Sequence, residues 1–205
     1  MILQRKLTIL ANYIINSMGS VYINAPLAVL IGYLNNYMGR HHDKYARRPY
    51  LKPFYDIYHS NFGIPLHRMY WLADIVIVIL AILWLTVCDW QALEEIIHMY
   101  IAMYSIRLAC ISCTSGYVSP RKLHTDHQQL YGTNNCFTDM CISGHLLTTC
   151  ILAFSVLDLT DNIEEQSIAI TLIIMSFGIN LLNGDHYTSD LILGVVLPYI
   201  AHYGI

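Results

Sequence analysis

Long apolar runs alternate with short polar or charged segments along most of this chain of 205 residues. The first run extends from Leu7 to Leu34, after a charged start at Arg5 and Lys6, and we expect a bend or break near Gly19 and Pro26. A helix needs about 20 residues to cross a membrane. Unpaired backbone groups are not tolerated in lipid, so the runs should form helices. The pattern predicts six helices near residues 7–34, 71–88, 96–118, 143–157, 167–182 and 187–205, the last with Pro198 inside it.

The segments between the runs are polar. Residues 36–68 form a basic, aromatic-rich stretch with three prolines, and residues 119–141 form a loop that carries several histidines. Acidic residues mark the turns near 89–95 and 158–165. Six spans would use about 120 residues and leave the rest for loops. We therefore expect residues 1–205 to form a single membrane-embedded domain.

The composition strengthens this interpretation. Apolar residues make up 56% of the chain, charged residues 12%, and the mean hydropathy is +0.46. Ordinary soluble domains carry about 25% charged residues. The fold class is therefore predicted to be an all-α membrane protein, a six-helix transmembrane bundle. The net charge of −3 and the lack of a basic stretch interleaved with aromatic residues argue against a nucleic-acid partner.

The cysteines do not indicate a metal site or a disulfide scaffold. There are six in the chain, and Cys110 and Cys113 form a C-x-x-C spacing inside an apolar run. On a helix these two would share one face, and no second C-x-x-C or H-x-x-x-H lies nearby to complete a site. We expect them to pack as small apolar side chains, and we expect no metal and no cofactor.

Apart from His98 and His202 near the other face, the ionisable residues in or near the apolar runs gather toward one side of the predicted membrane domain. We call this side, which the chain reaches after the first helix, the X face. Strict alternation of the helices places Asp74, Arg107, His145, His186 and Asp190 toward the X face. An ionisable group within lipid is costly and marks a functional site by default. Several such groups from four helices are stronger evidence than any one of them.

These residue types suit phosphoryl transfer. His186 and Asp190 are four residues apart, so a carboxylate–imidazole hydrogen bond is expected to fix the His186 ring. His145 begins a different helix at the same face, so one histidine can attack phosphorus while the other protonates the departing oxygen. The planar donors of Arg107 suit phosphate oxygens. The alternatives are a structural His–Asp pair and an arginine that snorkels to the membrane interface.

Two motifs resemble those of the sphingomyelin synthases and related ceramide phosphotransferases. The segment from Asp139 to Ser143-Gly144-His145 resembles their D-x-x-x-S-G-H motif. The segment from His186 to Asp190 resembles their H-Y-T-x-D motif. Arg107, seven residues before Thr114, is similar to their third-helix motif, and the likeness covers roughly residues 60–205. The resemblance implies six membrane helices, a histidine-linked intermediate, catalytic residues His145, His186 and Asp190, and substrate contacts from Arg107, Asp139 and Ser143.

The chain departs from the family pattern at several positions. Thr138 fills the place of a glycine, and Leu146 replaces the threonine that usually follows S-G-H. The wider relatives are the type 2 phosphatidic acid phosphatases, which carry an arginine six residues before the last histidine. Here that position is Asn180. A phosphomonoester has one more negative charge than a phosphodiester, so the lost arginine favours headgroup transfer over phosphatase activity.

The predicted function is a lipid phosphotransferase that moves phosphocholine or phosphoethanolamine from a glycerophospholipid to ceramide, giving a sphingophospholipid and diacylglycerol. His186 is the expected nucleophile, oriented by Asp190, and His145 the expected acid and base. The first alternative is hydrolysis by a lipid phosphatase or a phospholipase C-type enzyme, with water as acceptor. The second is a protein that binds or transports lipid without catalysis. Membrane lipids are the expected partners in every case.

Two signals disagree about orientation. Nine of the 11 Lys and Arg residues lie at or toward the X face and two on the other side, which by the positive-inside rule puts the X face in the cytosol. The family resemblance puts the catalytic face in the lumen or outside the cell. Basic residues near a phospholipid site have another reason to be there. We therefore expect the family's orientation, in an endomembrane or the plasma membrane.

Overall fold

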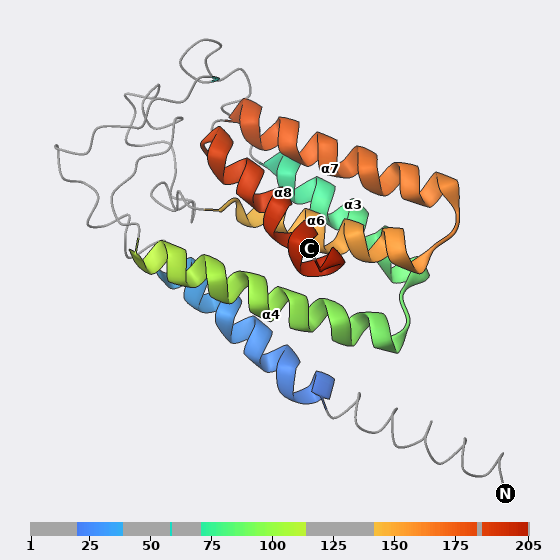
Figure 1. Ribbon diagram of the computed structural model, residues 1–205, viewed down its shortest axis with the longest axis horizontal. Coiled ribbons are helices and arrows are strands. Elements are labelled where there is room, and N and C mark those ends of the chain that lie inside the picture. Colours follow the sequence, from blue (N-terminus) through green and yellow to red (C-terminus); the bar gives the residue numbers. More distant parts are fainter. Residues whose placement is uncertain (1–19, 39–57, 59–70, 114–141, 184–185, 205) are drawn as a thin grey trace, which may run out of the picture.

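The computed structural model describes residues 20–38, 58, 71–113, 142–183 and 186–204. These residues form helices and no strands, so the all-α prediction is confirmed for the part of the chain described (Figure 1). The first helix covers residues 20–38. The others are α3 (Trp71–Val87), α4 (Trp90–Cys113), α6 (Gly144–Leu159), α7 (Ile163–Asn183) and α8 (Thr188–Tyr203).

Helix α6 forms the centre of the bundle. It contacts α3, α4, α7 and α8, and buried residues occur along its whole length (Figure 1). Leu146, Leu147, Cys150 and Ala153 are fully buried. Because α6 begins at Gly144, this arrangement surrounds the first turn of α6 with the ends of its neighbours.

Two helices begin earlier than their apolar runs. The prediction placed acidic turns near 89–95 and 158–165, but α4 begins at Trp90 and α7 at Ile163. Asp89 Oδ1 accepts a hydrogen bond of 2.7 Å from Ala92 N, and Asn162 Oδ1 accepts one of 2.9 Å from Glu164 N. Such side chains accept hydrogen bonds from the open N–H groups of a helix start. Carboxylates there also interact favourably with the positive end of the helix dipole. The acidic residues therefore belong largely to helix starts.

The first helix also differs from its prediction. It continues to residue 38 and passes through Pro26 without interruption, so the chain is not broken at Pro26, and the alternative of a bend there stays a prediction. Apolar helices tolerate an interior proline where neighbouring groups satisfy the freed carbonyl. Residues 7–19, including Gly19, lie outside the described part of the chain. At the other terminus α8 ends at Tyr203 rather than 205, since Gly204 adopts φ 64°, a conformation that favours glycine and stops helices.

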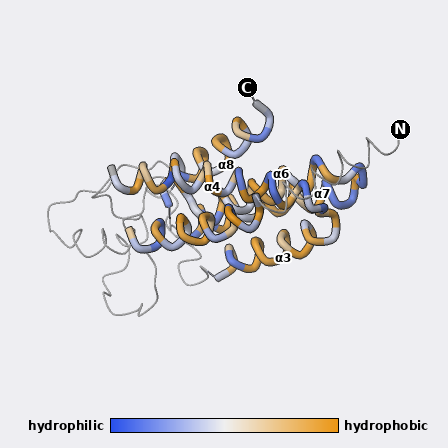
Figure 2. The backbone as a smooth tube through the Cα atoms, turned by 90° about the horizontal axis from the view of Figure 1, so that it is seen from below, coloured by the Kyte–Doolittle hydropathy of each residue, from blue (hydrophilic) through white to orange (hydrophobic). Residues whose placement is uncertain are grey.

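The second half of helix α7 buries polar side chains and exposes apolar ones. Ser176, Asn180 and Asn183 are fully buried, whereas Ile174 is 66% exposed. Soluble proteins show the opposite pattern. The tube in Figure 2, coloured by hydropathy, carries apolar segments on every labelled helix. This distribution supports a lipid environment for the bundle.

The helices differ in their length relative to a membrane. Among those described, only α7 is both long and apolar enough to cross one, while α3 and α6 are apolar but shorter. At 1.5 Å per residue, the 16 residues of α6 span about 24 Å, against roughly 30 Å for a bilayer core. The six membrane crossings thus stay a prediction.

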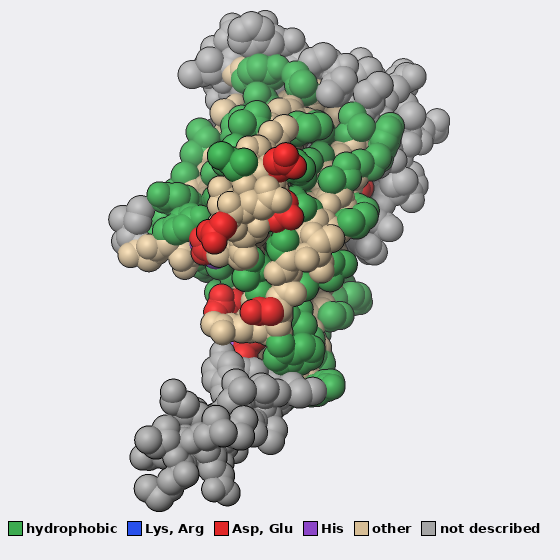
Figure 3. Space-filling view, turned by 90° about the vertical axis from the view of Figure 1, so that its right-hand side faces the viewer, with side chains coloured by type: hydrophobic (Ala, Val, Ile, Leu, Met, Phe, Trp, Pro, Cys, Tyr) green, Lys and Arg blue, Asp and Glu red, His purple; other side chains and the backbone are tan. Residues whose placement is uncertain are grey.

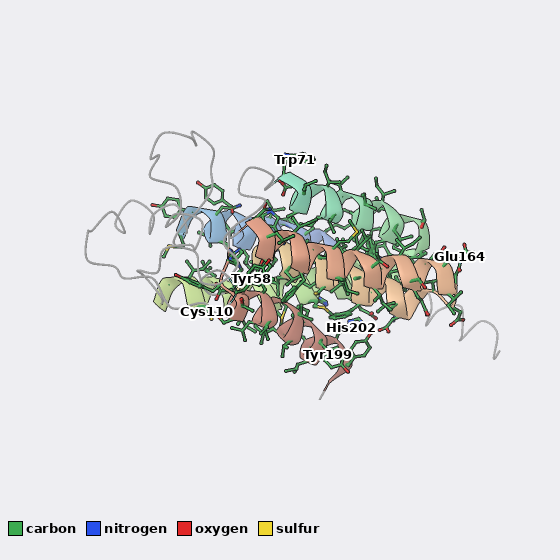
Figure 4. All side chains as sticks on the ribbon, turned by 90° about the horizontal axis from the view of Figure 1, so that it is seen from above. Tyr58, Trp71, Cys110, Glu164, Tyr199 and His202 are labelled. Carbon is green, nitrogen blue, oxygen red and sulfur yellow. The ribbon has the colours of Figure 1, made fainter. Side chains whose placement is uncertain are left out.

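Hydrogen bonds join the helices along the bundle. Trp84 Nε1 of α3 donates to Ser155 Oγ of α6 at 2.9 Å. At the end away from Gly144, His202 Nε2 of α8 lies 2.5 Å from Asp158 Oδ2 of α6, and Figure 4 labels His202 there. The turns at that end also carry acidic residues, and Figure 3 shows several carboxylates and no Lys or Arg on this face among the residues it describes. The two ends of the bundle therefore differ in chemistry.

Candidate active site

The candidate functional residues lie where helix ends meet at the opposite end of the bundle. Helix α4 ends there, and α3, α6 and α8 begin there, while α7 and the first helix also end on this side (Figure 1). This end corresponds to the predicted X face. It carries five of the six residues predicted from sequence to act or bind, namely Arg107, Ser143, His145, His186 and Asp190. The sixth, Asp139, lies outside the described residues.

Arg107 is buried inside this end of the bundle, with 7% of its surface exposed. Its Nε donates to the Ile142 carbonyl at 3.0 Å, and its Nη1 donates to Asn35 Oδ1 at 3.1 Å. Asn35 is itself held, since its Nδ2 donates to the carbonyls of Ile31 and Tyr104 at 2.9 Å each. A buried charge is stable only when it is hydrogen-bonded. These contacts contradict the snorkelling alternative and fix the guanidinium in place.

The guanidinium lies against the first residue of α6. A Cβ added to Gly144 would lie 3.4 Å from Arg107 Cζ. Gly144 thus allows a close approach between the arginine and the helix start. The charge of Arg107 is thereby placed beside the backbone that precedes His145.

Ser143 caps α6. Its Oγ accepts a hydrogen bond of 3.3 Å from Leu146 N, and its own N–H donates to the Asp190 carbonyl at 3.3 Å. The side chain is fully buried. Ser143 therefore joins the starts of α6 and α8, and its predicted contact with substrate stays a prediction.

Asp190 does not hydrogen-bond His186, contrary to the sequence-based expectation. The distance from His186 Nδ1 to Asp190 Oδ2 is 3.9 Å. Instead Asp190 Oδ2 accepts from Tyr187 N at 3.1 Å, and Oδ1 accepts from Ser189 Oγ at 3.4 Å. Asp190 is the third residue of α8, and a carboxylate at that position satisfies the open N–H groups of the helix start. Spacing alone does not distinguish this capping contact from a contact with the histidine.

His186 is a buried, neutral imidazole. It lies in the turn before α8 with 7% of its surface exposed. Burial, with smaller contributions from the charges of Arg107 and His145, lowers the pKa of His186 to about 3. Its Nδ1 is buried and has no hydrogen-bond partner among the described residues. An imidazole that stays unprotonated at neutral pH keeps a lone pair available for attack.

His145 is paired with a carboxylate from another helix. Its Nε2 lies 2.9 Å from Oδ1 of Asp74, in the first turn of α3. Both side chains are well exposed, 41% for His145 and 64% for Asp74. The sequence placed Asp74 at the X face but did not predict this pair. The two residues are 71 positions apart, so no helical spacing indicates the contact.

Tyr104 is a second residue whose position the sequence did not predict. Its hydroxyl donates to the Gly144 carbonyl at 3.0 Å and lies 2.6 Å from Thr148 Oγ1. Its ring lies under Arg107, with Cζ 5.9 Å from the ring centre. Tyr104 and Arg107 are three residues apart on one helix face, which was the available signal. Tyr104 thus connects Arg107 to the first turn of α6.

Among the described residues, no group of three or more His, Cys, Asp or Glu side chains is arranged to hold a metal ion. The cysteine pair predicted to pack is described in part, since α4 includes both positions but the side chain of Cys113 is not described. The ionisable side chains described at this end of the bundle include those of His145, His186, Asp74, Asp190 and Arg107.

Residues 135–203 match a family model described as PAP2 superfamily C-terminal. The chain resembles that family there. The matched region is about a third of the chain and contains His145, His186, Ser143 and Asp190. It supports the type 2 phosphatidic acid phosphatase superfamily and an enzyme of lipid phosphatase or phosphotransferase type. It does not single out the sphingomyelin synthases. A search of curated proteins found no match.

Proposed function

We propose that this protein is a lipid phosphotransferase that moves phosphocholine or phosphoethanolamine from a glycerophospholipid to ceramide. The products are a sphingophospholipid and diacylglycerol. The observation that carries the proposal is the meeting of a neutral buried His186, the His145–Asp74 pair and the buried Arg107 at one end of an apolar bundle. The match of residues 135–203 supports the same general chemistry.

In the first step His186 attacks the phosphodiester phosphorus. With Nδ1 buried on the side of Asp190, we assign the attack to Nε2. Bond formation to phosphorus leaves positive charge on the imidazole ring, and the Asp190 carboxylate at 3.9 Å stabilises that charge. Apo hydrogen bonds often tighten only when the substrate binds. Asp190 thus acts by positioning the turn and by its charge.

His145 acts as acid and base. It protonates the diacylglycerol oxygen as the bond to phosphorus breaks, and it then accepts the proton of the acceptor hydroxyl, which attacks the histidine-linked headgroup. Asp74 holds the His145 ring through Nε2, so Nδ1 is the nitrogen assigned to proton transfer. The sequence argued for this division of roles from a carboxylate behind His186, but the structure places the closer carboxylate behind His145. The division now rests on the burial and neutrality of His186.

Arg107 neutralises the phosphate. Its planar donors are held at a fixed position by Ile142 and Asn35, which suits two phosphate oxygens better than a flexible cation would. Asp139 and Ser143 are proposed to contact the headgroup. The catalytic face is proposed to lie in the lumen or outside the cell, with six helices crossing an endomembrane or the plasma membrane.

Hydrolysis is the second candidate. It is favoured by the family match, which covers phosphatases, and by the exposure of His145 and Asp74, which admits water to the site. Position 180 is asparagine and not arginine, which favours transfer. The phosphomonoester substrate of a phosphatase carries more negative charge to neutralise than a phosphodiester does.

The experiment uses purified protein in detergent with labelled phosphatidylcholine, phosphatidylethanolamine or phosphatidic acid, each with and without ceramide. Label in a sphingophospholipid only when ceramide is present is the expected result. Release of a water-soluble phosphate or phospho-headgroup at the same rate without ceramide would establish hydrolysis instead. Absence of turnover on all three donors would overturn both candidates.

A further inference from the structure

An apolar groove lies between the first helix, α4 and α6. Its volume is about 340 Å³, within the range of small-molecule sites. The lining side chains are apolar except at the hydroxyls of Tyr100 and Thr148 and include Ala25, Ala28, Ile97, Tyr100, Thr148 and Leu152. The groove is described entirely by residues of three helices and is separate from His186 and Asp190.

Small residues of the first helix leave this space open. Ala25 and Ala28 lie on the face toward α4 and line the groove. One turn further, a Cβ added to Gly32 would lie 3.0 Å from the Tyr100 hydroxyl, so the helices approach closely there. Larger side chains at positions 25 and 28 would fill the hollow. The groove therefore exists because of these residue sizes.

One side of the groove lies close to the candidate active site. Tyr100 stacks on Tyr104 with ring centres 4.1 Å apart, and Tyr104 contacts both Gly144 and Thr148. Thr148 lines the groove and is only three residues from His145. Positions 148 to 152 of α6 lie about 6–12 Å along the helix axis from Gly144. A molecule with its phosphate at Arg107 would thus reach the groove with its apolar part.

We propose that this groove holds one hydrocarbon chain of the phospholipid whose phosphate lies among Arg107, His145 and His186. The inference rests on the proposed function and adds the place where the lipid chain lies. A peptide segment or a second protein helix would bring polar backbone groups, and the lining offers only two hydroxyls to satisfy them. A hydrocarbon chain needs no such partners. The exposed apolar faces of the first helix, including Tyr22, Ile23 and Val29, also place lipid next to the groove.

The groove acts by position. A lipid chain that enters it leaves an equally apolar bilayer, so burial by itself adds little binding. A chain held at a fixed distance from Thr148 fixes the place of the phosphorus relative to His186. Small misplacements of a reacting atom cost on the order of a hundredfold in rate.

The test compares Ala28→Trp with the matched control Ile174→Trp, at a lipid-facing position of α7 that is 66% exposed. Each variant is assayed with a long-chain donor and with a short-chain, water-soluble donor of the same headgroup. Ala28→Trp is expected to lower turnover of the long-chain donor by about tenfold to a hundredfold and to leave the short-chain donor unchanged. Ile174→Trp should match the wild type on both. If a folded Ala28→Trp protein and the wild type show the same ratio of long-chain to short-chain donor turnover, the inference is overturned.

A binding measurement tests the position of the lipid chain without relying on turnover. A phospholipid with a diazirine in its acyl chain is photolysed with the protein, and labelled peptides are mapped. Label on Ile97 and Leu152 is expected in the wild type and Ile174→Trp, and it should fall at least about tenfold in Ala28→Trp. The smaller change Ala25→Leu serves if Ala28→Trp does not fold. If the groove is labelled but the protein shows no turnover, the proposed function is refuted and the lipid-chain site stands. If the protein turns over but its labelling is unchanged by Ala28→Trp and by Ala25→Leu, the lipid-chain site alone is refuted.

Discussion

Arg107 shows how individual residues make this site. A guanidinium inside an apolar bundle is costly unless its donors are satisfied. Asn35 and the Ile142 carbonyl accept from two different nitrogens of its planar group. Lysine presents a point charge on a flexible stem and does not reproduce this geometry. The residue type at position 107 therefore matters beyond its charge.

Arg107→Lys is expected to lower kcat/KM by about tenfold to a hundredfold. Hydrogen bonds to a charged group contribute about 1.5–3 kcal/mol, and one fixed contact is lost. Arg107→Ala should lower it further. Headgroup transfer by purified protein measures the effect, with thermal unfolding as the check on folding. Turnover at the wild-type rate in the lysine variant would argue against a direct phosphate contact.

The two histidines are expected to fail differently. His186→Ala should abolish headgroup transfer and any headgroup exchange between donors, because no covalent intermediate forms. His145→Ala should slow each step by about 10²–10⁴-fold, the usual contribution of general acid–base catalysis. Asp74→Asn should behave as a weaker His145 variant, since it changes the partner of His145 Nε2. Mass spectrometry of the trapped headgroup distinguishes the roles, and an adduct on residue 145 would reverse them.

The buried His186 should make the protein sensitive to acid. Its pKa is about 3 in the folded protein and near 6.5 in an unfolded chain, so between these values the unfolded chain binds an extra proton. The free energy of unfolding from this group is therefore fully favourable above about pH 6.5 and falls by up to about 1.4 kcal/mol per pH unit as the pH drops toward 3. His186→Asn removes this term. The unfolding temperature should fall less between pH 7 and pH 4 in the variant, and an equal fall in both proteins would contradict the burial of a neutral imidazole.

At the scale of elements, the position of the site depends on how closely α6 and α8 pack. A Cβ added to Gly194 would lie 3.3 Å from Leu146 Cβ and 3.5 Å from the Ser143 carbonyl. The starts of both helices are also joined by the hydrogen bond from Ser143 N to the Asp190 carbonyl. A glycine at position 194 therefore keeps the turn of His186 near the start of α6.

Gly194→Val should destabilise the protein by about 1–3 kcal/mol, the usual effect of overpacking, and reduce turnover with it. Gly178→Ala is the matched control, because nothing lies within 4 Å of a Cβ at that position of α7. Alanine there should stabilise the helix by about 0.5–1 kcal/mol without changing turnover. Thermal unfolding in detergent measures both. Equal effects of the two substitutions would show that the α6–α8 contact is looser than the structure indicates.

At the scale of the whole molecule, the bundle buries several polar side chains within a largely apolar interior and exposes many large apolar side chains. Buried Asn180 and Ser176 contrast with exposed Val78, Ile82 and Leu85 on α3. Arg107 is the one Lys or Arg among the described residues, and it lies at the end of the bundle that carries the histidines. The opposite end is acidic (Figure 3). This distribution suits a lipid bilayer around the middle of the bundle.

The protein is expected to stay in the membrane fraction after washing with alkaline carbonate and to be released by detergent. The reason is that α7 carries exposed apolar side chains and is long and apolar enough to span the bilayer. A cysteine introduced at Asp161 should also react with a membrane-impermeant reagent only from the side opposite the site. Release by carbonate would contradict the membrane prediction, and labelling of residue 161 from the lumenal or outer side would reverse the proposed orientation.

The sequence by itself determined the helical class and the approximate helices, and it singled out two histidines that the structure places at one end of the bundle. Apolar runs of this length in a chain with few charges have few other folded states, and Ser143 next to Gly144 marks a helix start that the structure confirms. The starts of α4 at Trp90 and of α7 at Ile163 differ from the prediction, because hydropathy alone does not distinguish helix caps such as Asp89 and Asn162 from turn residues. Local spacing predicts which residues share a helix face.

Only the tertiary structure decided which residues from different helices touch. Asp190 lies at the expected spacing from His186, yet its carboxylate caps α8, while His145 is paired with Asp74 from 71 positions away. The reason is physical: a carboxylate binds whichever donor the packing brings within reach, and packing is a property of the whole bundle. The burial that lowers the pKa of His186 and the groove beside Ala28 likewise arise from three or more helices together.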